Sequence, residues 1–211
     1  NGDAYSPGIY HAYQSEADAI GQEVVSVTTF PDDTNADFTV QLGEAQSAGA
    51  DLVFRPIYYT PASLILNQAK TMGYAPTFFG CDGMDGILDL EGFDTSLAEG
   101  LMLMTPFNAW GTDERTVNFV TTYQGQYDGI PNQFAADGYD CIYAIYEACQ
   151  KAGITADTSA ADVCEALVST FTSEDFSVDG LTGTGMTWSS TGEVSKAPVV
   201  VKVEGGVYVT Q

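Results

Sequence analysis

One short stretch of the sequence places a carboxylate in a glycine-rich turn directly after an apolar run. Residues 80–86 read GCDGMDG and follow APTFF, so Asp82 lies at the end of an expected strand. Four roles are compatible with an acid at this place: a turn former, a metal ligand, a catalytic acid, or the counter-charge of a cationic ligand. The rest of the sequence supports these roles unequally.

Metal ligation has little support. Residues 33–44, DTNADFTVQLGE, place oxygen ligands as a calcium loop would, but Phe38 stands where an EF-hand needs glycine for its sharp turn. Asp82 and Asp85 supply too few oxygens in sequence for a dedicated cage. The four cysteines show no CxxC spacing and have only His11 to join them, which disfavours zinc. We therefore predict no metal and no cofactor.

Catalysis has no recognisable centre. A serine triad needs a histidine base, and the one histidine, His11, falls inside an expected helix with no nucleophile motif in the chain. The glycines of GTGMTW (183–188) precede neither a lysine nor a helix, unlike those of a phosphate loop. A carboxylate pair of the glycosidase kind stays open among 29 acidic residues, but nothing selects one. We expect no enzyme and no catalytic residue, and an acidic secreted hydrolase is the weakest alternative.

Ligand binding is the role that the aromatic residues favour. In open α/β sheets ligands bind beyond the carboxyl ends of the strands. Three such ends carry Tyr5, the pair Tyr58–Tyr59, and Asp82. Tyrosine faces and hydroxyls around one carboxylate would enclose an ammonium group. Each residue alone also fits a plainer role in strand-end packing or in a turn.

The elements that would position these residues alternate between helix and strand. The pattern predicts helices over residues 6–20, 36–49 and 60–73, and strands over 23–30, 51–56, 76–80 and 99–107. Ser6 and Pro7 are typical of a helix start, and Gly73 of a helix end. The strands are nearly continuous apolar runs, which indicates an α/β fold with a parallel sheet covered by helices on both faces.

The pattern changes after Pro106. Three helices are expected, over residues 113–129, 132–153 and 159–171, and then short strands within 183–194 and 197–211. We expect residues 1–104 to form one lobe that lacks its first strand, 105–196 to form part of another lobe, and 197–211 to be terminal strands near the hinge. Because a parallel lobe normally opens with a strand, we expect this sequence to be the C-terminal part of a longer protein.

Composition excludes several classes of protein. The chain has 211 residues and a formal net charge of −23, which disfavours binding to nucleic acid and to anionic membranes and suits a protein outside the cell. No apolar stretch is long enough for a membrane span, and a signal peptide is not expected within this sequence. Cys141 and Cys149 lie eight residues apart on an apolar helix and are expected to be residues of the protein core, and a Cys149–Cys164 disulfide is left open.

Five stretches spread over the whole chain carry a family resemblance: DAYSPGI, the run from DFTVQLGEAQ to TFFGCDG, AEGLMLMTPF, VNFVTTYQGQYDGIPNQFAADGYDCIYAI, and LTGTGMTWSSTGEVSKAPVVVKVEGG. They resemble the branched-chain amino-acid-binding (leucine/isoleucine/valine-binding) family of type I periplasmic or extracellular solute-binding proteins, of which the chain matches the C-terminal two-thirds. The resemblance implies two doubly wound lobes, joined by crossing strands, that close over one small ligand.

The resemblance also implies a set of ligand-binding residues. They are Tyr5, Tyr58, Asp82 and Phe134, with Tyr59 and Met84 as further candidates. Asp82 would pair with the α-ammonium group of an amino acid, and Phe134 would line the pocket for its side chain from the other lobe. The groups that hold the α-carboxylate belong to the N-terminal segment that this chain lacks.

The implied function is that of an extracytoplasmic substrate-binding protein, periplasmic or a cell-surface lipoprotein, which delivers a small, aliphatic amino acid to a membrane ABC permease. A ligand-sensing domain of the same fold is the alternative. Because the missing first strand would leave a sheet edge exposed, we expect the isolated chain to self-associate or to pair with its N-terminal segment.

Overall fold

A computed structural model describes residues 2–31 and 36–211. The chain forms two compact units: unit 1 comprises Asn1–Thr105 and Val200–Gln211, and unit 2 comprises Pro106–Val199. Unit 2 is therefore an insertion between two strands of unit 1. No helix among the described residues combines the length and the apolar character needed to cross a membrane.

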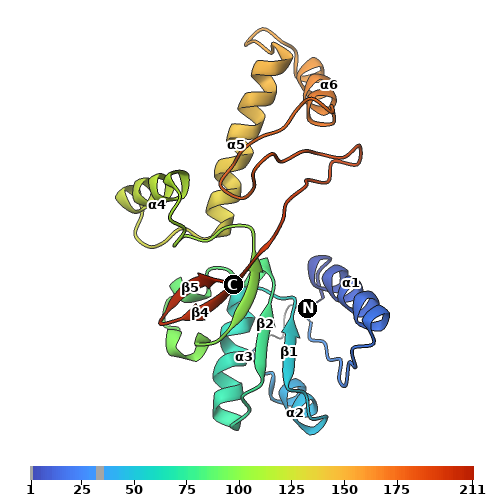
Figure 1. The fold of residues 1–211 in the computed structure, drawn as a ribbon, viewed down its shortest axis with the longest axis vertical. Helices are drawn as coiled ribbons and strands as arrows, with labels where there is room; N and C mark the ends of the chain where they lie inside the picture. The colour runs from blue at the N-terminus through green and yellow to red at the C-terminus, as the bar shows by residue number, and fades with distance from the viewer. Residues whose placement is uncertain (1, 32–35) are drawn as a thin grey trace. The chain divides into compact units, whose positions relative to one another are not determined.

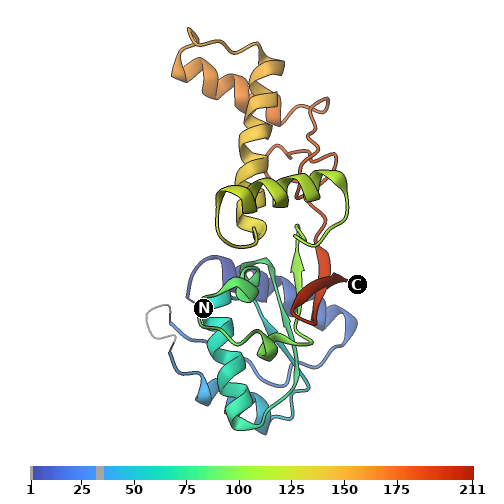
Figure 2. The same ribbon diagram turned by 90° about the vertical axis from the view of Figure 1, so that its left-hand side faces the viewer.

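Unit 1 contains a five-stranded sheet with the order β1-β2-β3-β4-β5. Its strands are β1 Leu52–Arg55, β2 Thr77–Gly80, β3 Met102–Thr105, β4 Val199–Glu204 and β5 Val207–Thr210. The first three strands are parallel, and β4 and β5 form an antiparallel hairpin next to β3 (Figure 2). Gly205 and Gly206 have φ angles of 62° and 81°, which the two-residue hairpin turn requires of its central positions.

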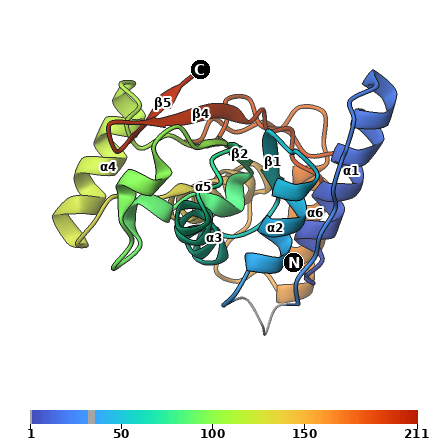
Figure 3. The same cartoon turned by 90° about the horizontal axis from the view of Figure 1, so that it is seen from below.

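Helices cover both faces of this sheet. They are α1 Tyr5–Ile20, α2 Thr39–Ser47 and α3 Tyr59–Met72. Consecutive strand residues point to opposite faces. Tyr13 of α1 stacks on Phe54 with ring centroids 4.5 Å apart, while the next residue, Arg55, donates a hydrogen bond to the Ala62 carbonyl of α3. The two helices therefore lie on different sides of β1, as Figures 1 and 3 show.

Most of the predicted elements of unit 1 are confirmed. Helix α3 ends at Gly73, whose φ of 67° is the left-handed conformation that a C-terminal glycine supplies. Helix α1 starts slightly earlier than expected, and the Asp3 carboxylate, rather than Ser6, accepts the hydrogen bond of a first-turn amide. The calcium-loop positions 33 and 35 lie outside the described residues.

The strand predicted over residues 23–30 is wrong. Residues 22–31 have neither helical nor strand structure. The sequence EVVSVTTF has the β-branched character of a strand, but a strand forms only when a neighbour completes its hydrogen bonds. None of the strands in the described part of the chain pairs with this segment.

Unit 2 consists of helices α4 Glu114–Gln126, α5 Gln133–Ala152 and α6 Ala160–Phe171, followed by a long irregular segment. Asp113, Asn132 and Ser159 cap the three helices through their side chains. Instead of the short strands predicted within 183–194, the structure has two isolated bridges, Val178–Met186 and Trp188–Val194. These bridges bring Val178 and Met186 into a buried cluster with Ala144 and Ala148 of α5.

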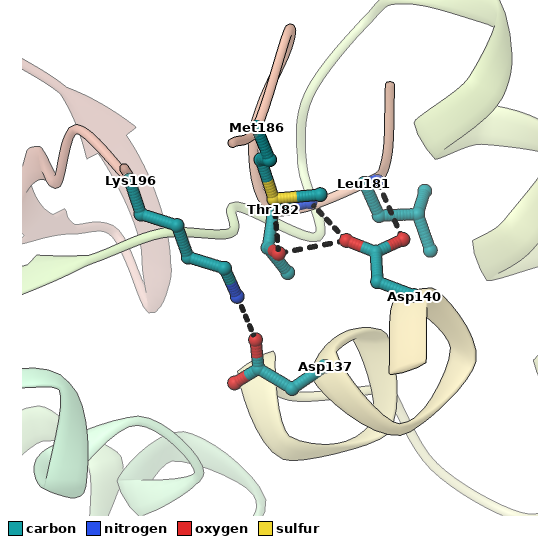
Figure 4. Close-up of polar contacts among 6 residues, drawn as sticks. All are labelled: Asp137, Asp140, Leu181, Thr182, Met186 and Lys196. Atoms are coloured by element: carbon teal, nitrogen blue, oxygen red, sulfur yellow. Dashed lines mark hydrogen bonds and ion pairs between the residues drawn. The ribbon is translucent and has the colours of Figure 1, made fainter. Parts of the chain in front are cut away.

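Two aspartates of α5 tie the irregular segment to the helix (Figure 4). The buried Asp140 accepts hydrogen bonds from the backbone amides of Leu181 and Thr182, both at 2.8 Å, and from the Thr182 hydroxyl at 2.7 Å. One turn earlier on the same helix, Asp137 forms an ion pair of 2.6 Å with Lys196. Two carboxylates of α5, together with the isolated bridges and the buried cluster, thus hold this segment in the absence of a regular sheet.

The structure answers the question of a disulfide that the sequence left open, and it differs from the expectation for Cys141. All four are free thiols, so Cys149 and Cys164 do not form a disulfide. Cys141 is exposed and not in the core. Cys141 lies three residues before Ala144 and seven before Ala148, on the same side of α5, but the buried cluster contains the two alanines and does not extend to Cys141.

Candidate ligand-binding site

Three of the predicted binding residues lie together at the carboxyl end of the sheet in unit 1. Tyr58 follows β1 and precedes the first residue of α3. Asp82 opens the short 3-10 helix η1 Asp82–Met84, two residues after Gly80, which is the last residue of β2. Tyr5 is the first residue of α1. The parallel arrangement of β1 and β2 brings their following loops to one edge, as the sequence predicts.

The hydroxyl group of Tyr5 connects these loops. It donates a hydrogen bond of 2.6 Å to Oδ1 of Asp82 and accepts one of 2.9 Å from the backbone amide of Gly83. A hydroxyl has one proton to donate, so the Asp82 carboxylate is the acceptor. Burial, reinforced by this hydrogen bond to Asp82, raises the pKa of Tyr5 well above its ordinary value. Tyr5 therefore keeps its proton and holds the acid in one orientation.

Gly83 is required for this contact. A Cβ atom at this position would lie 2.9 Å from the Tyr5 hydroxyl oxygen and 3.0 Å from the Ile57 carbonyl oxygen. Both distances are shorter than ordinary van der Waals contact, and the second involves backbone that cannot easily move. The glycine that follows the acid in GCDG thus admits the tyrosine ring from α1.

Aromatic surface adjoins the carboxylate. The rings of Tyr5 and Tyr58 are 5.1 Å apart between centroids and are tilted by 32°. Tyr58 is 38% exposed, so part of its ring faces solvent, and Asp82 is half-buried. A carboxylate next to an accessible aromatic face has the chemistry to attract an organic cation by charge and by cation–π interaction.

The neighbouring thiol is not suited to catalysis. Cys81 is buried, and burial, with a smaller effect from the Asp82 charge, raises the pKa of this thiol to about 12. The thiolate is the nucleophilic form of cysteine, and this site disfavours it. Among the described residues, no group of three or more potential metal ligands is gathered anywhere.

Of the other candidate residues, Tyr59 and Met84 belong to unit 1 and Phe134 belongs to unit 2. Tyr59 is half-buried in the first turn of α3. Met84 is fully buried and fills the space next to Gly80, where a Cβ atom would clash with its sulfur. Phe134 belongs to unit 2, where it lies in the first turn of α5 and is 42% exposed.

The sequence reasoning missed two backbone groups at this edge. The Gly83 amide binds the Tyr5 hydroxyl, and the Ile57 carbonyl lies close enough to exclude a larger residue from position 83. The signal for both was the glycine after Asp82, which the sequence analysis treated as part of a turn.

A mixed sheet covered by helices, with an inserted second unit and polar and aromatic residues at the carboxyl ends of its strands, defines a type I periplasmic-binding-protein fold. A model of the periplasmic binding protein family matches residues 1–207. The chain belongs to this family. It thereby has the fold and family of binding proteins, in agreement with the resemblance found in the sequence.

Solved structures show the same fold. A leucine-binding protein from Thermotoga maritima has a TM-score of 0.79 and 24% sequence identity, over 99% of this chain and 57% of that chain. An ABC transporter substrate-binding protein from Desulfitobacterium hafniense, in complex with Leu, has a TM-score of 0.71 and 22% identity, over 100% of this chain and 58% of that one.

An extracellular ligand-binding receptor from Rhodopseudomonas palustris has a TM-score of 0.85 and 17% identity, over 100% of this chain and 61% of its own. The chain therefore spans about three-fifths of the length of these structures. A search of curated proteins found no match.

Proposed function

We propose that this chain is part of an extracytoplasmic solute-binding protein that binds a small amino acid, with a branched-chain or other aliphatic side chain, and presents it to an ABC permease. Membership of the periplasmic binding protein family supports the binding role. The structures named for leucine binding or solved with Leu support the ligand class. The single observation that carries the proposal is the Tyr5–Asp82 hydrogen bond beside the half-exposed Tyr58 ring.

In this proposal Asp82 accepts hydrogen bonds from the ligand ammonium group. Tyr5 orients the carboxylate through its Oδ1 atom, and the face of Tyr58 lies against the positive charge. A charge-assisted hydrogen bond between an ammonium and a carboxylate is roughly twice as strong as a neutral one. Binding would therefore discriminate strongly against a ligand that lacks the amino group.

The remaining contacts of the ligand are also part of the proposal. Phe134 contributes an apolar contact to the aliphatic side chain, with residues 1–104 and 105–196 belonging to different lobes and 197–211 lying near the hinge. The donors for the ligand α-carboxylate come from the portion of the protein that this chain does not span.

The test is calorimetric titration of the complete protein with the twenty common amino acids and with their N-acetylated forms. We expect an aliphatic amino acid to bind, and its N-acetyl derivative not to bind. The matched variant is Asp82→Asn, which keeps the size of the side chain and removes its charge. Removing one partner of a buried charge pair costs roughly 2–5 kcal/mol, so affinity should fall from about 30-fold to several thousand-fold.

Asp89→Asn is the control, because Asp89 is an exposed carboxylate on the nearby 3-10 helix η2 Ile87–Asp89. This variant should bind as the unmodified protein does. If no amino acid binds to the folded protein, the ligand class is wrong. If a ligand binds equally well to Asp82→Asn, its ammonium group lies elsewhere.

A further inference from the structure

A second carboxylate next to the candidate site has no part in the proposed function. Asp85 follows Asp82 by three residues in the segment 82–86, which we call the acid loop. Asp85 is 3% exposed, whereas Asp82 is half-buried. Its neighbours Met84 and Ile87 are fully buried. Burying a carboxylate is unfavourable unless other groups compensate its charge, so the surroundings of Asp85 indicate what it does.

The two acids of the acid loop are connected through one short turn. Asp82 begins the 3-10 helix η1 and Asp85 directly follows it, and the Asp85 amide donates a hydrogen bond of 2.9 Å to the Asp82 carbonyl. Met84 lies between them in the turn, is fully buried, and fills the space next to Gly80 at the end of β2. Because the turn is closed by this hydrogen bond and packed against the sheet, a displacement of Asp85 is transmitted to Asp82.

Tyr208 is the aromatic residue that lies next to Asp85. It belongs to β5, where it is opposite Val203 of β4, and it is 4% exposed. Burial and, next in size, the negative charge of Asp85 raise the pKa of Tyr208 well above its ordinary value. The backbone of Gly86 acts on the same hydroxyl in the opposite direction. Tyr208 therefore keeps its proton next to the buried carboxylate.

This arrangement repeats the one at Asp82. There, the Tyr5 hydroxyl binds both the carboxylate and the amide of the glycine that follows the acid. At the second acid, the Tyr208 hydroxyl interacts with Asp85 and with the backbone of the glycine that follows it. Each Asp-Gly step of the acid loop is thus contacted by one tyrosine, the first from α1 and the second from β5.

We propose that Asp85 is a positioning residue of the ligand-binding site and that Tyr208 is its anchor on the terminal hairpin. Asp85 does not bind the ligand itself. It fixes the acid loop, so that Asp82 meets the ligand ammonium group in one orientation. This inference rests on the proposed function, in which Asp82 is the ammonium partner. It extends the site to β5, an element that follows the whole of unit 2 in the sequence.

A purely structural contact between Asp85 and Tyr208 has a different consequence. It would lower the stability of a variant but leave the affinity of the folded molecules unchanged. Tyr74 offers a matched comparison, because it is also a buried tyrosine of unit 1. Its hydroxyl donates a hydrogen bond of 2.8 Å to the carbonyl of Ala50, just before the amino end of β1 and thus at the opposite end of that strand from Tyr58.

Calorimetric titration of the complete protein with leucine provides the first test. Tyr208→Phe and Asp85→Asn should each lower the affinity by about 5-fold or more, within the range of couplings between residues of one network. Tyr74→Phe should unfold more easily but bind leucine as the unmodified protein does. Tyr208→Phe removes only a hydroxyl, so it decides the test if Asp85→Asn does not fold. Unchanged affinity in the folded Tyr208→Phe protein would overturn the proposal.

A double-mutant cycle shows whether Tyr208 acts through Asp82. Once Asp82→Asn has removed the charge, there is no carboxylate left to orient. In that background Tyr208→Phe should therefore change the affinity by less than about 2-fold, although it has the larger effect in the unmodified protein. Equal losses in both backgrounds would mean that the effect does not pass through Asp82, and the positioning role would be wrong.

A measurement without ligand separates this inference from the proposed function. The Gly83 amide donates a hydrogen bond of 2.9 Å to the Tyr5 hydroxyl, so its proton resonance reports on the arrangement of Tyr5 and Asp82. We expect NMR of the ligand-free protein to show this resonance shifted in Tyr208→Phe and unshifted in Tyr74→Phe. An unshifted resonance in Tyr208→Phe would contradict the positioning of Asp82. A shifted resonance in a protein that binds no amino acid would support that positioning and contradict only the proposed ligand.

Discussion

Tyr5 and Asp82 lie 77 residues apart in the sequence, and the Tyr5 hydroxyl donates a hydrogen bond of 2.6 Å to the Asp82 carboxylate. The acid that we propose as the ammonium partner is therefore held by the first residue of α1, an element outside its own loop. Its orientation depends on how that helix packs against the sheet, and the following predictions test this dependence.

Tyr5→Phe should weaken ligand binding without abolishing it. The change removes the donor to Asp82 and leaves the partly buried Gly83 amide without its acceptor. Losing one hydrogen bond of this kind costs about 1–3 kcal/mol, so calorimetry should show affinity lower by roughly 5-fold to 150-fold. Tyr10→Phe is the control, because the Tyr10 hydroxyl bonds Gln14 on the same helix. If Tyr5→Phe and Tyr10→Phe bind the ligand with equal affinity, Tyr5 does not contribute to the binding site.

Stability should decrease at alkaline pH because of Tyr5. Burial, with the Asp82 hydrogen bond, raises the pKa of Tyr5 in the folded protein above its unfolded value of about 10. The stabilisation from protonated Tyr5 is thus complete below about pH 10 and is lost as the pH rises toward the higher folded pKa. Urea unfolding should be measured between about pH 8 and pH 11, a range that brackets the unfolded tyrosine pKa of about 10. The free energy of unfolding should decrease less with rising pH for Tyr5→Phe than for the unmodified protein. Parallel curves would contradict the raised pKa.

Gly83→Ala should impair binding more than stability. The added Cβ would lie 2.9 Å from the Tyr5 hydroxyl oxygen and 3.0 Å from the Ile57 carbonyl oxygen, so the tyrosine ring must shift away from Asp82. We expect unfolding to become easier by about 1–3 kcal/mol and the Tyr5–Asp82 bond to be lost. Gly43→Ala, a helix position whose nearest neighbour would be 4.0 Å away, should be neutral or stabilising. A crystal structure of the Gly83→Ala protein with Tyr5 still on Asp82 would refute this account.

Two aspartates of α5 should differ sharply in their contributions to stability. Asp140→Asn replaces an acceptor of three hydrogen bonds by an amide whose NH₂ group must face a backbone donor. Leaving a buried donor unpaired costs about 1–3 kcal/mol. Asp137→Asn breaks a partly exposed ion pair with Lys196, which is worth about 0–1 kcal/mol. Chemical denaturation of unit 2, followed through Trp188, should rank the variants in this order, and the reverse order would show that the ion pair dominates.

Helix α3 illustrates what the sequence predicts well. Its start follows a strand and includes Pro61 in the first turn, and its end is set by Gly73, whose φ is 67°. These signals are local, because the residues that define each end lie within the helix or next to it. The placement of Tyr58 and Asp82 at one edge follows equally simply, since the carboxyl ends of parallel strands coincide.

Residues 23–30 illustrate what could not be predicted. Their β-branched sequence is typical of a strand, but strand formation depends on a neighbour in space and not on the segment itself. The same limit applies to the site. The hydrogen bond from Tyr5 to Asp82 requires the packing of α1 and the absence of a side chain at Gly83, neither of which is a property of the local sequence.

The insertion of unit 2 between β3 and β4 has a consequence for synthesis on the ribosome. Unit 2 is one continuous stretch, Pro106–Val199, and can fold as soon as it has emerged. The sheet of unit 1 must wait for Val199–Thr210, because β4 is the neighbour of β3. During that interval β3 offers an open edge to other nascent chains, so the order of translation itself creates a period of exposure to misassembly.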